Sequence, residues 1–166
     1  YRSIIAQNQI DCDFETKSAF IYSLDQTQTI RAEADAAKRL GIDAEFTTKT
    51  NLPFSIQAAV KFSNQAQFNP LKFLKYISSD LNIYEHTMAL LVRDNTIITN
   101  RGRITADRIV IATHFPFINV PGWYFARMHQ QRSYVIALKN AAQLDGMYID
   151  EDENGYSLRN YGEYVL

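Results

Sequence analysis

Cysteine and glycine are scarce in this sequence of 166 residues, which has one cysteine and six glycines. The single cysteine, Cys12, excludes a disulfide within the chain and suits a reducing cytoplasm, where we expect the protein to lie. The six glycines never form the G-x-G-x-x-G turn that brings a pyrophosphate to the N-terminus of a helix. The chain therefore has no glycine-rich fingerprint for tight dinucleotide binding.

An excess of charge of one sign is also missing, because 17 Lys and Arg residues nearly balance 18 Asp and Glu residues, for a net charge of -1. The basic residues are scattered, whereas nucleic-acid binding usually needs a basic patch, so we expect no nucleic acid as partner. No apolar run approaches the length of a membrane span, and we expect none. The hydrophobic share of 46% is that of an ordinary globular protein.

Both ends of the sequence look cut. It begins at Tyr1 without an initiator Met, and it stops at Leu166 inside an apolar run that is typical of a strand. We therefore expect a fragment of a longer polypeptide. Strand edges left unpaired at such ends would allow self-association.

The spacing of apolar residues predicts a mixed α+β fold that combines α/β elements with an antiparallel sheet. Helices are expected at residues 3–9, 26–40 and 70–80, the second of them capped by Asp25. The third begins with Asn69 as cap and Pro70 at its first position, where a missing N–H costs nothing. Its apolar stripe is expected to consist of Leu71, Leu74, Ile77 and Leu81.

Strands are expected between and after these helices, because β-branched and aromatic residues alternate there with polar ones. The early strands are placed at residues 17–24, 44–46 and 58–62, and a meander of three strands at 83–113. Its last strand, residues 108–113, is apolar throughout its centre and should be buried on both faces. Short strands of an antiparallel sheet are expected at 123–127, 133–139, 147–150 and 156–166.

Three stretches resemble the FAD-dependent oxidoreductases of the D-amino-acid oxidase and glycine oxidase type. Residues 64–74, N-Q-A-Q-F-N-P-L-K-F-L, are similar to the family's x-x-P-x-x-L start of a flavin-domain helix. Residues 83–91 resemble the strand that passes the adenine of FAD. Residues 102–113, G-R-I-T-A-D-R-I-V-I-A-T, resemble the family's G-x-I-x-A-D-x-V-V-x-A-T-G hairpin, with His114 where the family usually has Gly.

The resemblance implies the parent's activity and domain order. The parent would be a flavoprotein that oxidises a C–N bond of a small-molecule amine or amino acid by hydride transfer to FAD, which this piece alone would not retain. Residues 12–68 and 117–166 would belong to the substrate domain and residues 69–116 to the FAD-binding domain. The residues expected beside the cofactor are Ala89, Ala112, Thr113 and His114.

Arg and Tyr side chains late in the chain are the candidates for binding a substrate carboxylate or amine, because Arg grips a carboxylate with two hydrogen bonds and Tyr offers a rigid hydroxyl. They are Tyr124, Arg127, Arg132, Tyr134 and Tyr148. On antiparallel strands such residues also form plain surfaces, and this alternative is favoured for each residue taken singly.

Metal chemistry is not expected. His86, His114 and His129 lack metal-ligand spacing. The stretch D-E-D-E-N-G at 150–155 opens like a calcium loop, but Tyr161 stands at its twelfth position, so a solvated acidic turn is favoured. The alternative to the oxidoreductase is a stand-alone α+β ligand-binding module without catalytic activity.

Overall fold

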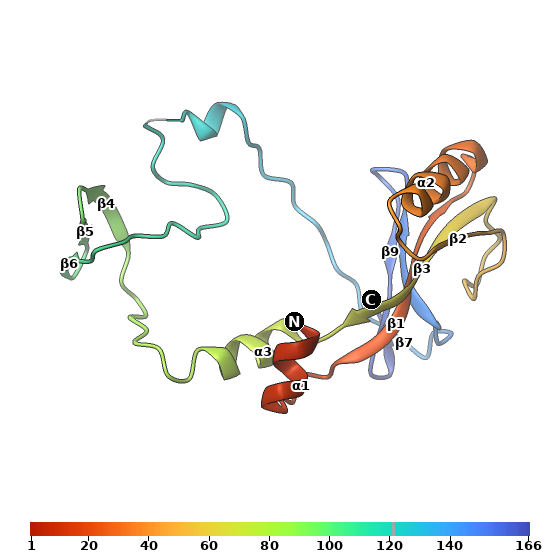
Figure 1. Cartoon of the computed structure of the whole chain (residues 1–166), viewed down its shortest axis with the longest axis horizontal. Coiled ribbons are helices and arrows are strands. Elements are labelled where there is room, and N and C mark those ends of the chain that lie inside the picture. The colour runs from red at the N-terminus through yellow and green to blue at the C-terminus, as the bar shows by residue number, and fades with distance from the viewer. Residues whose placement is uncertain (121) are drawn as a thin grey trace. The chain divides into compact units, whose positions relative to one another are not determined.

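The structure, a computed structural model that describes residues 1–120 and 122–166, divides into two units (Figure 1). Unit 1 contains residues 1–79 and 135–166, and unit 2 contains residues 80–134. Helices and several sheets confirm the predicted mixed α+β fold. Within the described ranges, no helix is both long and apolar enough to cross a membrane.

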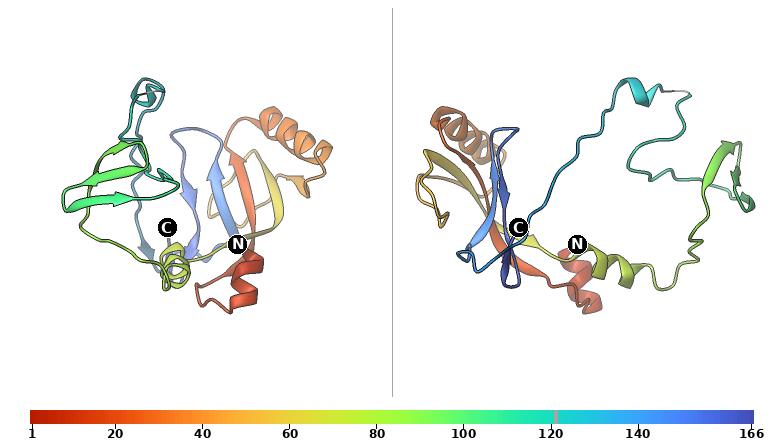
Figure 2. Two further views of the ribbon diagram at one scale, coloured as in Figure 1. Left: turned by 60° about the vertical axis from the view of Figure 1, so that its left-hand side comes forward. Right: turned by 180° about the vertical axis from the view of Figure 1, so that it is seen from behind.

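A five-stranded sheet forms the centre of unit 1, and Figure 2 shows it from two further sides. Its strands lie in the order β2-β3-β1-β8-β9, with bounds Ala44–Thr47, Ala58–Gln67, Glu15–Ser23, Gly146–Asp150 and Ser157–Leu158. β8 runs parallel to β1, whereas the other neighbours are antiparallel. The late strands β8 and β9 pair antiparallel as expected, and the parallel pairing of β8 with β1 arises because a crossover from residue 24 to 145 returns the chain in the same direction as β1.

Helix α2, Thr27–Arg39, covers one face of this sheet, as predicted for residues 26–40. Its Ile30, Ala34 and Ala37 pack with Ala58 and Val60 of β3. The expected cap, Asp25, was wrong: the N-cap is Gln26, and the Ser23 hydroxyl accepts the Gln26 backbone N–H at 3.0 Å. Because side chains alternate between the two faces of a strand, every second side chain of β1 and β3 lies on the face that α2 covers.

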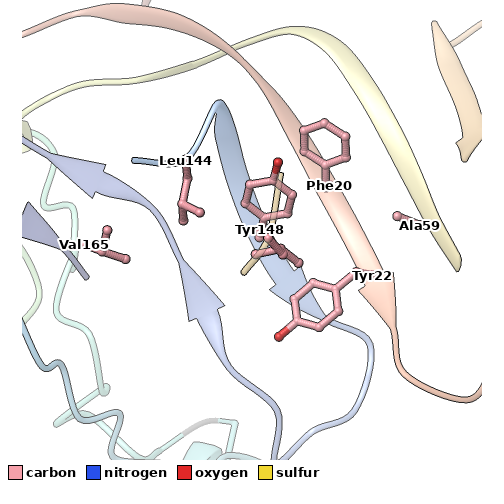
Figure 3. Packing of buried hydrophobic residues seen from close by; sticks show 7 residues of the cluster. Phe20, Tyr22, Ala59, Leu144, Tyr148 and Val165 are labelled. Atoms are coloured by element: carbon pink, nitrogen blue, oxygen red, sulfur yellow. The ribbon is translucent and has the colours of Figure 1, made fainter. Parts of the chain in front are cut away.

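The opposite face of the sheet carries a second apolar cluster, shown in Figure 3. Phe20 of β1 stacks on Tyr148 of β8 with ring centroids 4.6 Å apart. Because Phe20 and Tyr148 are directly paired across the parallel strands, their rings point to one face. The other buried members are Tyr22, Leu52, Ala59, Leu144 and Val165. Both faces of the sheet are therefore covered.

Helix α3, Pro70–Ile77, begins as predicted, with the Asn69 side chain accepting the backbone N–H groups of Leu71 and Lys72. It packs on helix α1, Arg2–Asn8, through Phe73, which is buried with three residues from the start of the chain: Ile5, Ile10 and Cys12. The predicted apolar stripe was wrong as a core face. Leu71 is 76% exposed, and Leu74, Ile77 and Leu81 are exposed as well, because the buried contact of α3 is centred on Phe73.

A small sheet completes unit 1, in the order β10-β11-β7, with bounds Asn160–Tyr161, Tyr164–Val165 and Leu138–Lys139. Asn160, 8% exposed, ties this sheet to the segment before β8. Its side-chain amide donates to the Leu144 carbonyl at 2.8 Å, and its side-chain oxygen accepts the Leu144 N–H at 3.2 Å.

Unit 2 contains the predicted three-stranded meander, in shorter form: β4 Ala89–Arg93, β5 Thr96–Thr99 and β6 Gly102–Thr105. None of its described residues is buried. A strand predicted at residues 123–127 was wrong, since Tyr124–Ala126 form a 3-10 turn.

The predicted buried strand at residues 108–113 was also wrong. These residues form no strand, and Val110 and Ile111 are 86% and 43% exposed. Apolar composition favours a buried strand only where neighbouring strands supply hydrogen bonds and cover, and β6 ends at Thr105 before this segment begins.

Candidate functional site

A hollow of about 600 Å³ lies in unit 1, where the end of β3 and the start of α3 meet β10, and is called the β10 pocket below. Its size is within the range of small-molecule sites, about 300 to 1,000 Å³. Apolar lining comes from Phe68, Pro70, Leu71, Leu166 and the ring of Tyr161. Polar lining comes from Asp13, Glu15, Gln67, Asn69, Lys72, Arg159 and Asn160.

Three of the four charged side chains in the β10 pocket form ion pairs within the protein. The Lys72 ammonium lies 2.7 Å from the Asp13 carboxylate, and Lys17 lies 3.0 Å from Glu15. The hydrogen bond from Lys72 holds the pKa of Asp13 below its usual value, and the same bond raises the pKa of Lys72. Arg159 is the remaining charged side chain, and within the described residues it has no ion-pair partner.

Gln67 joins the two sides of the β10 pocket. Its side-chain amide donates to Glu15 and to the Asn160 carbonyl, both at 3.1 Å. Its side-chain oxygen is buried and has no hydrogen-bond partner among the residues that the structure describes. The two donated bonds fix the orientation of the amide. The bond to Asn160 connects β3 with β10, although the two residues are 93 positions apart in the sequence.

A second hollow, of about 340 Å³, lies over β2 and β3, with Lys49, Asn51, Lys61 and Asp145 in its lining. The Tyr148 hydroxyl donates a hydrogen bond to the Asp145 carboxylate. Burial, and then this hydrogen bond, raise the pKa of Tyr148. Its phenol therefore stays protonated at neutral pH and acts as a donor within the protein.

The four residues predicted to lie beside a cofactor are in unit 2. Ala89 is the first residue of β4 and pairs with Thr99. Ala112, Thr113 and His114 are exposed and follow the meander in a stretch without regular secondary structure. Their assignment to a ligand stays a prediction.

The structure distributes the five predicted substrate-binding residues over both units. Tyr124, Arg127, Arg132 and Tyr134 are exposed in unit 2. Tyr148 is only 2% exposed and belongs to the core of unit 1. A role for any of them in substrate binding stays a prediction.

The residues of the β10 pocket were not found from the sequence. Gln67 lies in the stretch 64–74 that was compared with a helix start, whereas Arg159 and Tyr161 lie in no motif, and the three meet because the end of β3 and the β10 strand lie together in unit 1. The only local signal was Asn69-Pro70, which was correctly interpreted as the start of a helix.

The chain is similar to a curated protein and to a solved structure. The chain is 33% identical over 170 aligned residues to the Putative Rieske 2Fe-2S iron-sulfur protein YhfW of Bacillus subtilis (strain 168), an alignment that includes 95% of the chain. The chain spans about a third of that relative's length, 33%. No protein-family model matches.

The fold is similar to that of glycine oxidase from Bacillus cereus ATCC 14579, with a TM-score of 0.70 and 22% identity. The match covers 99% of the chain and 53% of the glycine oxidase chain. At this identity the similarity shows the fold alone, since one fold serves many functions.

The resemblance to FAD-dependent oxidoreductases of the D-amino-acid oxidase type led to a wrong assignment. The relative at 33% identity is named for a Rieske 2Fe-2S protein, which contradicts FAD as cofactor, the flavoprotein assignment and the oxidation of a C–N bond. The physical reason lies in the motif. Residues 102–113 contain the strand β6 followed by an apolar run, and β-branched stretches of this kind occur in proteins of many functions.

The residues present do not fit a Rieske cluster. In such a centre two Cys ligate one iron and two His ligate the other. The chain has three His but only one Cys, and Cys12 is 1% exposed within the core of unit 1. The described part of the chain also contains no group of three His, Cys, Asp or Glu side chains that could hold a metal ion.

Proposed function

We propose that the chain is a non-catalytic α+β ligand-binding module of an electron-transfer protein of the Rieske 2Fe-2S type, and that the cluster of this longer protein is bound outside these 166 residues. The observation that carries the proposal is 33% identity over 95% of the chain to a protein named for that cluster. The lack of a second Cys supports a location of the cluster elsewhere. The β10 pocket supplies the ligand-binding part.

The ligand in this proposal is a small molecule. A cytoplasmic location belongs to the same proposal. It is supported by Cys12, a buried free thiol, which is the usual state of cysteine in a reducing compartment.

The proposal is tested by expressing the complete reading frame and the 166-residue chain side by side with iron–sulfur assembly factors. Iron, acid-labile sulfide and the electron paramagnetic resonance spectrum of the reduced protein are measured on both. We expect one 2Fe-2S cluster per complete polypeptide and none on the 166-residue chain. A cluster on the 166-residue chain, or no cluster on the complete polypeptide, would overturn the proposal.

Cys12→Ser in the complete polypeptide is the matched variant. Because Cys12 packs in the apolar cluster with Ile5, Ile10 and Phe73, we expect an unchanged iron and sulfide content. A loss of cluster from folded Cys12→Ser protein would show that this thiol is a ligand and would contradict the proposal.

A further inference from the structure

The β10 pocket combines an apolar wall with one unpaired cation. Phe68, Leu71 and Leu166 provide the apolar wall. Arg159 lines the same hollow and has no ion pair within the described ranges, and its backbone N–H and C=O are held by Leu166 at 3.1 and 2.8 Å. The guanidinium is therefore free to bind while the strand that carries it is fixed.

Asn69 and Tyr161, which line the same pocket, both carry hydrogen-bond donors. The side-chain oxygen of Asn69 is already occupied by the backbone amides of Leu71 and Lys72, which leaves its amide N–H groups 3.5 Å from the Tyr161 hydroxyl. The two bonds accepted by the side-chain oxygen of Asn69 thus orient its NH₂ group toward Tyr161. The Tyr161 hydroxyl accepts from Asn69 and keeps its own O–H to donate, and an arginine fork with a hydroxyl donor in the same hollow can recognise a carboxylate.

The acidic side chains of the pocket are already engaged. A ligand ammonium would have to share these carboxylates with Lys72, 2.7 Å from Asp13, or with Lys17, 3.0 Å from Glu15. The side-chain oxygen of Gln67, which has no partner among the described residues, is sealed from solvent. The balance of unused groups therefore favours an anion over a cation.

We propose that the β10 pocket binds a small organic carboxylate with an apolar body, that Arg159 holds the carboxylate, and that the body lies against Phe68, Leu71 and Leu166. This inference rests on the ligand-binding part of the proposed function and is independent of where the cluster is bound. The proposal is binding alone and includes no covalent step.

Three probes with one aromatic body and different head groups test it: phenylbutyrate, phenylbutanol and phenylbutylamine. Each is titrated into the 166-residue chain by calorimetry, with amide chemical shifts to locate the site. We expect phenylbutyrate to bind at least about tenfold more tightly than phenylbutanol, because an ionic hydrogen bond is worth about 1.5 to 3 kcal/mol and 1.4 kcal/mol is a factor of ten. Phenylbutylamine is expected to bind most weakly.

Two substitutions separate the head-group contact from the apolar contact. Arg159→Gln should weaken phenylbutyrate about tenfold to a hundredfold and leave phenylbutanol almost unchanged. Leu71→Asn should weaken all three probes by a similar factor. Arg39→Gln, at the exposed end of α2, is the matched control and should change no affinity. Circular dichroism of each variant confirms folding, since neither Arg159 nor Leu71 is buried.

The proposal is overturned if phenylbutylamine binds best, if Arg159→Gln leaves phenylbutyrate binding intact, or if shifts map outside the pocket. It is also overturned if the complete polypeptide, folded and loaded with its cluster, fails to bind phenylbutyrate, because the pocket would then be an internal interface. Cluster content and probe affinity are measured separately. A failure of the proposed function can thus be distinguished from a failure of the proposed carboxylate site.

Discussion

Replacing Asn160 by Ala should strongly destabilise unit 1. The side chain makes the two hydrogen bonds to the backbone of Leu144 described above, and both are buried. Truncation leaves the N–H and C=O of Leu144 without these partners, while Leu144 itself belongs to the core beside Phe20 and Tyr148. The substitution therefore acts on the connection between β10 and the segment that leads into β8.

The expected loss follows from these two bonds. A buried polar group left without its partner costs about 1 to 3 kcal/mol, so the pair predicts a loss of about 2 to 6 kcal/mol. This is a large part of the stability of an ordinary domain, about 5 to 15 kcal/mol. With a urea slope of about 2 kcal/mol per molar, the unfolding midpoint should fall by about 1 M or more.

The assay is urea unfolding followed by far-ultraviolet circular dichroism, together with hydrogen exchange of the Leu144 amide. Asn154→Ala, in the exposed turn between β8 and β9, is the control and should change stability by less than about 0.5 kcal/mol. If Asn160→Ala unfolds at the same urea concentration as the control, the reasoning is refuted.

Asn160→Asp adds a test with a defined sign. The new carboxylate still accepts the Leu144 N–H but faces the Leu144 carbonyl, so the folded state should favour its protonated form and raise its pKa above the unfolded value of about 3.9. The stability of this variant should be highest below that value and should decrease as the pH rises through the folded pKa. A variant whose stability relative to wild type is independent of pH would contradict the placement of the carbonyl.

Three further predictions concern residues whose surroundings are equally specific. Burial raises the pKa of Tyr22 to about 12, so the contribution of the protonated phenol to folding stability is complete below about pH 10 and is lost as the pH rises toward 12. Tyr22→Phe should reduce this alkaline loss of stability by about 2 kcal/mol in urea titrations. Identical stability profiles against pH for the variant and the wild type would contradict this expectation. Gly146→Ala would place a Cβ 2.6 Å from the Phe20 ring and should cost about 1 to 3 kcal/mol, which an unchanged unfolding midpoint would disprove. Val110→Ser with Ile111→Ser should alter stability by less than about 0.5 kcal/mol, whereas a loss above about 2 kcal/mol would show that the segment is buried.

Local patterns predicted the elements whose causes lie within a few residues. Asn69 and Pro70 began α3 because a cap and a first-turn proline act on adjacent backbone groups. Alternation placed Phe20 and Tyr22 on one face of β1, and both are buried. The mixed α+β fold followed from such elements.

Features that depend on distant partners could not be predicted in this way. Residues 108–113 have the composition of a buried strand, but composition does not state which strand pairs with it. The parallel pairing of β1 with β8 depends on a crossover, and the β10 pocket joins Gln67 to Asn160. The oxidoreductase interpretation was wrong for the same reason, since a strand-forming motif was interpreted as a cofactor motif, whereas the alternative of a non-catalytic module fits the comparisons better.

The parallel pairing of β1 with β8 also determines the order in which unit 1 can be completed during synthesis. β1 pairs early with β3 on one side, but its other edge waits for β8, which the ribosome makes only after the whole of unit 2. Until then Phe20 and Tyr22 lie on an incompletely covered face beside an open strand edge, which is the structure most prone to pair with another chain. A pause in translation between the two segments would lengthen this exposure, so the nascent chain, more than the finished fold, is where unit 1 is vulnerable to aggregation.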